Sequence, residues 1–428
     1  MTKYPYERRH SRWYELLLLN SLLHFICAYT FIVLAPFLLQ WQSITAPASS
    51  TVAYNSLIAS SAAFIIIFLI LYKLKNLPST HLLPSIIPTI ILVWLGVLAT
   101  FFFLREASYS RSVLLSSFLL TYAWAFLAFF FIRRYGVSKL ALVPFGRANE
   151  LLELETSTRI CPLQEPDLQG RRYDGVVADL HAKDLPVDWQ RFLANCTLAG
   201  IPVYHTQQAY ETLTGRVKVE HLSENIFGAL LPSRIYSLVK RIIDILLALI
   251  TLPIWLPITL LAGIIIKFES EGPMFFIQKR VGQGNKDFNV YKLRSMCCDS
   301  EKNGAQFAQS NDMRITRVGK FIRKTRIDEL PQFINILKGD MSLIGPRPEQ
   351  RAFVDQFTKD IPFYSYRHVV KPGITGWAQV TQGYAADTDD TRIKIQYDFY
   401  YIKHFSLWLD LVVTIRTIYT IFTGFGAR

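Results

Sequence analysis

The sequence predicts a membrane protein of three parts: an N-terminal four-helix transmembrane bundle, a small α/β domain and a C-terminal α+β domain. Hydrophobic residues make up 51% of the 428 residues, and the mean hydropathy is +0.23. Residues 1–135 carry 10 Lys and Arg against 3 Asp and Glu, residues 136–230 carry 9 against 12, and residues 231–428 carry 27 against 18. Charged residues are 18% of the chain, too few for a disordered protein. This composition disfavours a plain soluble enzyme.

The cysteine pattern argues against two further classes. The chain has five cysteines with no paired CxxC spacing. An odd number without that spacing disfavours both a disulfide scaffold and a cysteine-ligated zinc site. Free thiols in a reducing compartment fit better.

Four apolar segments in the first part are each long enough to cross a bilayer, which takes about 20 helical residues. They are about Leu16–Leu39, Val52–Tyr72, Leu82–Leu104 and Val113–Ile132. Lys and Arg gather before the first segment, between the second and third, and after the fourth. The positive-inside rule therefore predicts that both ends of the bundle are cytoplasmic. His24 is the isolated ionisable group in these segments, and we interpret it as a packing residue.

The middle part, residues 136–230, alternates short apolar strands with helical patterns, which predicts a parallel sheet. The strands are Lys139–Pro144, Asp174–Asp179 and Ile201–His205, and the helices are Ala148–Thr156 and Val187–Ala199. The unit resembles a degenerate Rossmann-like domain. Its first loop, Pro144-Phe-Gly-Arg147, has one glycine where a dinucleotide loop has three, so a structural or regulatory role is favoured.

A fifth apolar segment, Ile242–Ile266, has basic residues on both flanks. The charge rule therefore places neither flank outside. Pro253 and Pro257 each remove a backbone donor near its middle. A helix broken there could enter and leave on one face of the membrane, while an ordinary kinked span fits the residues equally well.

The strongly basic part begins with a predicted hairpin of Met274–Gln278 and Phe288–Leu293. Lys292 and Arg294 alternate on its second strand, so both could face one phosphate, although a solvated strand face is an equal alternative. The segment Arg314–Arg326 combines an apolar stripe with six basic residues. It could lie on anionic lipid or bind a phosphorylated substrate. Nucleic acid is disfavoured because the aromatic residues of a base-stacking surface are missing.

Two neighbouring carboxylates, Asp328 and Glu329, follow this basic segment at the start of a predicted helix. Acidic residues favour a helix N-terminus, and Thr325-x-x-Asp328 matches a capping box. Nearby arginines would also keep an aspartate ionised and nucleophilic, which favours a catalytic role. Arg347 follows in the extended Gly345-Pro-Arg-Pro348 and suits phosphate binding.

An ordered set of motifs in residues 234–428 resembles the bacterial sugar transferase family, the monotopic polyprenyl-phosphate phosphoglycosyl transferases. The four spans and the Rossmann-like unit resemble the long form, the polyprenyl-phosphate hexose-1-phosphate transferases. The motifs are Lys240-Arg-x-x-Asp244, Pro257, Tyr291-Lys-Leu-Arg-Ser-Met296, Asp328-Glu-Leu-Pro-Gln332, Leu337-Lys-Gly-Asp-Met-Ser342, Gly345-Pro-Arg-Pro348, Arg367-His368 and Pro372-Gly-Ile-Thr-Gly-Trp-Ala-Gln-Val380.

The resemblance implies a covalent mechanism. Asp328 would attack the β-phosphate of a UDP-sugar, UMP would leave, and undecaprenyl phosphate would take the sugar phosphate from the aspartate. Glu329 would help to deprotonate or position the acceptor, and Mg²⁺ would bridge Asp328 and the diphosphate. Arg323 and Arg347 match phosphate-binding positions. Lys292, Arg294, Arg367 and Asp410 are further candidates, although Asp410 could equally be a helix-start residue.

The resemblance also implies a location and a pathway. Residues 240–268 would form a re-entrant helix broken at Pro257, with Pro253 as an additional proline, so the domain 231–428 would stay on the cytoplasmic side of the bacterial inner membrane. The enzyme would initiate exopolysaccharide, capsule or O-antigen synthesis for downstream glycosyltransferases. Glucose or galactose is the expected sugar, with N-acetylated sugars as an alternative. Oligomeric state is open, including a homodimer. The rival hypothesis is a non-catalytic membrane scaffold of glycan assembly.

Overall fold

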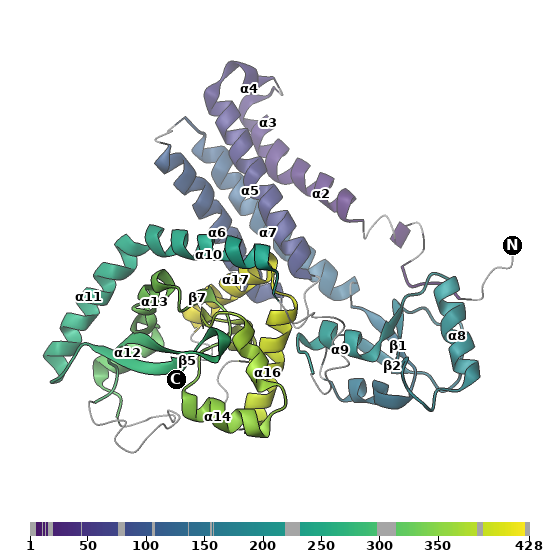
Figure 1. Ribbon diagram of the computed structural model, residues 1–428. Coiled ribbons are helices and arrows are strands. Elements are labelled where there is room, and N and C mark those ends of the chain that lie inside the picture. The colour runs from purple at the N-terminus through teal and green to yellow at the C-terminus, as the bar shows by residue number, and fades with distance from the viewer. Residues whose placement is uncertain are drawn as a thin grey trace. The chain divides into compact units, whose positions relative to one another are not determined.

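The computed structural model divides the chain into two compact units, residues 1–215 and 216–428 (Figure 1). The structure describes residues 6–10, 12, 14–15, 20–43, 45–75, 82–104, 108–135, 137–154, 156, 158–218, 232–297, 314–382 and 388–423. The division into domains at residues 135 and 230 stays a prediction. Lys3 and the beginning of the first apolar segment, residues 16–19, lie outside the described residues.

The first unit begins with apolar helices. They are α2 (Ser21–Tyr29), the π-helical turn η1 (Thr30–Leu34), α3 (Ala35–Trp41), α4 (Ala46–Ser49), α5 (Thr51–Lys75), α6 (Leu82–Phe103) and α7 (Arg111–Tyr135). Four stretches among them are long and apolar enough to cross a membrane: Ser21–Trp41, Thr51–Leu74, Ser85–Phe103 and Arg111–Phe131. The predicted N-terminal apolar helices are thus confirmed, and the protein is a membrane protein.

Aromatic side chains hold these helices together. Phe64 of α5 is fully buried and lies 5.9 Å, ring to ring, from Trp124 of α7. Phe25 of α2 packs at 5.4 Å on the same Phe64. His24 lies 5.9 Å from the ring of Phe131, which fits its predicted packing role.

The α/β part of this unit contains a parallel sheet of order β2-β1-β3-β4, as the alternating pattern predicts. Its strands are β1 (Lys139–Leu142), β2 (Arg159–Pro162), β3 (Gly175–Ala178) and β4 (Val203–His205). Its helices are the 3₁₀ helix η2 (Gly146–Glu153), α8 (Val187–Leu198) and α9 (Thr206–Thr214). Trp189 and Phe192 of α8 are buried against β3. Strand β2 was not predicted, because it is a short edge strand that contains Arg159 and Pro162.

The N-terminal segment is tied to the amino ends of the two central strands, β1 and β3. The backbone N–H of Arg9 donates to the carbonyl of Tyr173 at 3.0 Å. The Arg9 guanidinium donates to the carbonyl of Val137 at 2.6 Å and to Asp174 at 3.1 Å. The residues before the first apolar helix and those after α7 therefore meet on one side of the helices between them.

The second unit is α+β. Its helices are α10 (Arg234–Ile250), α11 (Leu252–Glu269), α12 (Arg317–Lys324), α13 (Gln332–Lys338), α14 (Arg351–Asp360), α15 (Trp377–Thr381), α16 (Thr388–Lys403) and α17 (Leu407–Thr423), with 3₁₀ helices η4 (Gln283–Asn285), η5 (Ile327–Glu329) and η6 (Tyr364–Val369). Strands β5 (Phe275–Val281) and β6 (Asp287–Leu293) form the predicted antiparallel hairpin, and β7 (Ser342–Ile344) pairs in parallel with β8 (Gly373–Thr375).

The fifth apolar segment is interrupted at Thr251, between α10 and α11, where the chain changes direction (Figure 1). Pro253 lies in the first turn of α11, where its missing N–H costs little. The Trp255 indole donates to the Ala248 carbonyl at 3.0 Å, which satisfies one acceptor at the end of α10. Pro257 lies inside α11, so the predicted break at Pro257 is wrong in position. Only Leu252–Glu269 in the described residues of this unit has the length and hydropathy of a span.

Helix α10 turns three of its charged residues, Lys240, Arg241 and Asp244, toward the protein. The Arg241 guanidinium donates to the carbonyls of Ile336 and Leu337, at the end of α13. Lys240 pairs with Asp410, and Asp244 accepts a hydrogen bond from the Leu343 N–H at 3.2 Å. The exposed side chains of α10 are mostly large and apolar: Ile235, Leu238, Val239, Ile242, Leu246, Leu247, Leu249 and Ile250.

Candidate active site

The two neighbouring carboxylates lie on η5, between the basic helix α12 and helix α13. Arg326 precedes them with a left-handed backbone, φ 57°, which turns the chain sharply at the end of α12. The Thr325 hydroxyl donates back to the Phe321 carbonyl at 2.9 Å. It therefore closes α12, and the predicted capping box from Thr325 to Asp328 is wrong.

Glu329 is held as a buried carboxylate. It is 6% exposed, and one oxygen accepts a hydrogen bond from Arg347 Nη2 at 2.9 Å. Its other oxygen lies 3.6 Å from Arg326 Nη1. Burial acts to raise the pKa of Glu329, but the charges of Arg347, Lys292 and Arg326 outweigh it and lower that pKa. Glu329 is therefore ionised and locked in place.

Asp328 has the opposite character. It is half-buried, and among the described residues no hydrogen bond to its carboxylate is found. Burial and the negative charge of Glu329 raise its pKa, while Lys292, Arg347 and Arg323 act against this rise. Adjacent carboxylates whose pKa values are pushed apart take different chemical roles. Asp328 has the more basic carboxylate and the less buried side chain, as a nucleophile needs.

Lys292, Arg323 and Arg347 surround these carboxylates with positive charge. The structure thus brings five of the predicted site residues together. Burial and the charges of Arg347 and Arg280 lower the pKa of Lys292. A cluster of cations this crowded lowers the cost of bringing an anion into it.

Three other candidate residues are buried in structural contacts. Arg294 donates to the Ser270 carbonyl at 2.7 Å and to its hydroxyl at 2.9 Å, at the end of α11. Asp410 accepts hydrogen bonds from Tyr401 at 2.7 Å, from Tyr236 and from Lys240. Arg367 pairs with Asp398 at 2.9 Å. The prediction that Arg294 and Lys292 face one ligand is therefore wrong.

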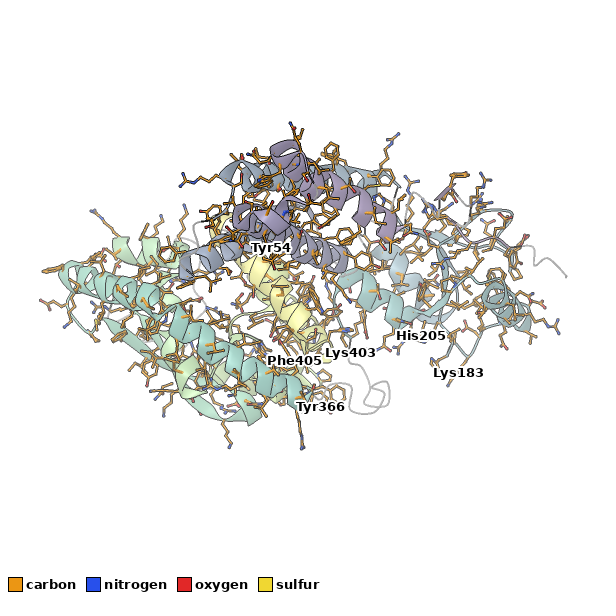
Figure 2. The ribbon with its side chains drawn as sticks, turned by 90° about the horizontal axis from the view of Figure 1, so that it is seen from above. Tyr54, Lys183, His205, Tyr366, Lys403 and Phe405 are labelled. Carbon is orange, nitrogen blue, oxygen red and sulfur yellow. The ribbon has the colours of Figure 1, made fainter. Side chains whose placement is uncertain are left out.

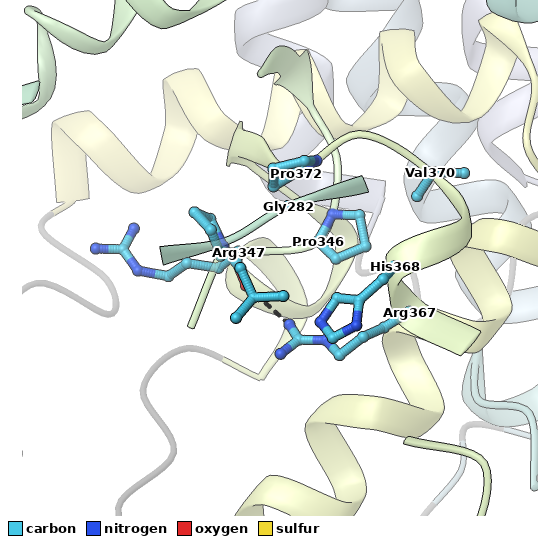
Figure 3. A pocket seen from close by; sticks show the side chains of 9 residues that line it. Gly282, Pro346, Arg347, Arg367, His368, Val370 and Pro372 are labelled. Atoms are coloured by element: carbon cyan, nitrogen blue, oxygen red, sulfur yellow. Dashed lines mark hydrogen bonds between the residues drawn. The ribbon is translucent and has the colours of Figure 1, made fainter. Parts of the chain in front are cut away.

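Arg367 acts on the site through the backbone. Its guanidinium donates to the Arg347 carbonyl at 2.8 Å (Figure 3). The carbonyl of the following residue, Pro348, accepts a hydrogen bond from the Arg280 guanidinium at 2.6 Å. The Lys394 ammonium group forms an ion pair with the Glu349 carboxylate at 2.6 Å. These contacts fix the extended segment that presents Arg347.

Sequence reasoning missed several members of this arrangement: Arg280, Arg326, Glu349, Lys394 and Asp398. Their contacts join residues far apart in the chain, such as Lys394 and Glu349 at a separation of 45. A single sequence carries no signal for such pairs. Arg326 is the exception, because it lies only three residues before Glu329 and could have been suggested.

A small open hollow, with about 10 Å³ of space for a water-sized molecule, lies beside the Arg347 backbone. Its lining includes Pro346, His368, Val370 and Gly282 (Figure 3). The guanidinium of Arg347 extends away from the other lining side chains, whereas that of Arg367 lies beside His368. Sites for drug-sized ligands measure roughly 300–1,000 Å³. The hollow is therefore too small to enclose a nucleotide sugar by itself.

Residues 235–424 match the family model described as "Bacterial sugar transferase". The UDP-N-acetylgalactosamine-undecaprenyl-phosphate N-acetylgalactosaminephosphotransferase of Aeromonas hydrophila is 53% identical over 423 residues, covering 99% of this chain and 100% of the relative. A UDP-glucose:undecaprenyl-phosphate glucose-1-phosphate transferase of Caulobacter vibrioides is 41% identical over 46% of this chain and 74% of its own. A putative undecaprenyl-phosphate N-acetylgalactosaminyl 1-phosphate transferase of Bacillus subtilis is 54% identical over 31% of this chain and 74% of its own.

Proposed function

Because the chain belongs to the bacterial sugar transferase family and is a membrane-bound phosphoglycosyl transferase, we propose that it moves N-acetylgalactosamine 1-phosphate from UDP-N-acetylgalactosamine to undecaprenyl phosphate. The similarity that favours this sugar is 53% identity over the whole of a relative with that name. The glucose or galactose expected from the sequence is the second candidate, because a shorter match bears a glucose name. The product would initiate a surface polysaccharide, which downstream glycosyltransferases would extend.

Asp328 is the proposed nucleophile. One of its oxygens attacks the β-phosphorus of the donor, the bond between the two phosphates breaks, and UMP leaves. An oxygen of undecaprenyl phosphate then attacks the same phosphorus and releases the aspartate. The single observation that carries this assignment is the contrast between the accessible Asp328 and the locked Glu329.

Glu329 has a positioning role in this proposal. Its lowered pKa and its hydrogen bond from Arg347 make it a poor acceptor of protons at neutral pH. It holds the guanidinium of Arg347 next to the place where phosphate charge develops. Lys292, Arg323 and Arg347 would balance that charge.

The donor set suits Mg²⁺, which usually binds through one or two carboxylates and the phosphates of its substrate. The half-buried Asp328 carboxylate accepts no hydrogen bond among the described residues, whereas the oxygens of Glu329 face arginines. When bound, the ion would neutralise negative charge between the carboxylate and the diphosphate.

A panel of UDP-sugars tests this function directly. With purified full-length protein, undecaprenyl phosphate and Mg²⁺, we expect UMP release to be fastest with UDP-N-acetylgalactosamine. A site that hydrogen-bonds the acetamido group should discriminate against the plain hexose. Faster release with UDP-glucose or UDP-galactose would reassign the sugar, and no release with any donor would contradict the proposal.

The membrane arrangement is also a proposal. In the sequence, four apolar helices lie between the N-terminal segment and the sheet. In space, Arg9 of that segment contacts Asp174 beside the sheet. An even number of spans places both on one face, which the positive-inside rule identifies as cytoplasmic. The break at Thr251, with the outward apolar face of α10, supports a helix pair that enters and leaves the inner membrane on that face.

A cysteine after α11 tests the re-entrant arrangement. In a variant without the natural cysteines, Glu271→Cys is expected to resist a membrane-impermeant thiol reagent added to intact cells. Glu271 is exposed, and its backbone carbonyl accepts a hydrogen bond from Arg294, which the substitution spares. Ser43→Cys, between the first two apolar helices, is the control that should react. Labelling at position 271 before lysis would establish a spanning helix.

A further inference from the structure

The α/β part carries three metal-binding side chains that the proposed reaction does not use. Asp179 directly follows β3, His181 lies two residues later, and His205 ends β4. The two strands are adjacent and parallel, with Ala178 opposite His205. In open α/β sheets, ligands bind outside the carboxyl ends of the strands, near the point where strand order reverses. Here that point lies between β1 and β3.

The side chains converge on a small volume. His181 Nδ1 lies 2.9 Å from His205 Nε2, which lies 3.6 Å from Asp179 Oδ1. All three atoms lie within 4.8 Å of one another. Tetrahedral zinc with bonds of 2.0–2.2 Å keeps its ligand atoms about 3.3 Å apart. Small side-chain adjustments would let these atoms surround one ion. Figure 2 labels His205 and, from the loop after β3, Lys183, which together mark this part of the α/β sheet.

The carboxylate is oriented by its surroundings. Asp179 Oδ2 accepts the Arg147 N–H at 3.0 Å, and Oδ1 accepts the His181 N–H at 3.1 Å. Gly146, with φ +57°, lies so close that a Cβ there would be 2.5 Å from Oδ2. Outer hydrogen bonds of this kind hold metal ligands in place. They leave Oδ1 directed toward the two imidazoles.

We propose that Asp179, His181 and His205 bind a divalent transition-metal ion, with Zn²⁺ as the best match. Two imidazoles and one carboxylate suit zinc, whereas Mg²⁺ prefers oxygen ligands alone. Three protein ligands leave the remaining position to water or an anion. The site lies in a different unit from Asp328 and is independent of the function proposed above.

Two existing hydrogen bonds must break when the ion binds. The bond between His181 Nδ1 and His205 Nε2 is lost because both nitrogens become ligands, and the bond that caps α9 is lost with it. His205 Nδ1 now accepts the Gln207 N–H at 3.1 Å and caps α9. Zinc on Nε2 would place the remaining proton on Nδ1, and two N–H groups would then face each other. The affinity of zinc for these three ligands must therefore exceed the stabilisation that the cap gives to α9.

Zinc titration of the purified full-length protein tests the site, with excess Mg²⁺ present to occupy oxygen-only sites. We expect one Zn²⁺ per chain, and Co²⁺ in its place should show the absorption bands of tetrahedral coordination. His181→Gln should weaken binding about 100-fold or more, because it removes a direct ligand. His181 is exposed, so this variant should fold, and Asp184→Asn in the same loop is the matched control.

His205→Gln and Asp179→Asn should each repeat the loss of zinc affinity. Wild-type affinity in all three variants, or no zinc binding by the natural protein, would overturn the proposal. The three side chains would then be a hydrogen-bonded cluster that caps α9.

Discussion

Asp328→Asn is expected to abolish sugar-phosphate transfer, with a loss of at least about 1,000-fold in UMP release. The amide keeps the shape of the side chain but has no anionic oxygen to attack phosphorus. Asp328 accepts no hydrogen bond within the described part of the chain, so its replacement should leave the fold intact. The natural protein, incubated with donor alone, should gain the mass of a sugar phosphate on the peptide that contains Asp328.

Asp355→Asn is the matched control for this substitution. Asp355 is exposed in the same unit, and its nearest cation is Arg351 at 3.9 Å. The control should release UMP at the natural rate. A mass adduct in the Asp328→Asn protein, or activity close to that of the control, would remove Asp328 from the chemical step.

Arg347→Met is expected to reduce both activity and stability. Removal of one charged hydrogen-bond donor from a site of developing charge typically costs about 100- to 1,000-fold in rate. The substitution also leaves the buried Glu329 without its closest cation. Because Arg347 is 29% exposed and Arg326 remains nearby, we expect a loss of about 2–3 kcal/mol, below that of a fully buried pair.

The double variant Arg347→Met with Glu329→Gln separates the two effects. It removes the unpaired carboxylate, so thermal unfolding should return toward the natural value, while UMP release should stay low. The sign of the pH effect follows from Glu329, whose folded pKa is lowered. The stability that it contributes is present above its unfolded pKa and is lost as pH falls. The single variant should therefore differ most from the natural protein at neutral pH. Equal unfolding temperatures there would contradict the role of the pair.

The reactive residues could be predicted from sequence, because local patterns place them. Asp328 and Glu329 follow a basic segment, and Arg347 lies in an extended proline-rich segment. Lys292 lies inside β6, where alternation correctly assigns a face. Arg294 lies one residue beyond the end of β6, so the same alternation no longer applies, and its side chain turns into the protein.

The structural residues could not be predicted, because their partners are distant. Arg367 meets Asp398 at a separation of 31 residues, and Asp410 meets Lys240 at a separation of 170. A lone charged residue in a sequence looks the same whether it binds substrate or pairs inside the fold. The break in the fifth segment was placed at the wrong proline for a related reason. Helix α10 ends before Pro253, which has no N–H to continue it, and the Trp255 indole donates to the freed Ala248 carbonyl, while α11 continues through Pro257.

Helix α10 presents charged residues to the protein and apolar residues outward, so its two faces can be redesigned separately. Its folding contacts are made by Lys240, Arg241 and Asp244, while Ile242, Leu246 and Leu249 face outward. An engineer could therefore exchange the outward residues for polar ones and keep every contact that organises residues 216–428. Such a protein would no longer rely on the bilayer to bring the acceptor phosphate to the active site. We expect it to act on short-chain, water-soluble acceptors.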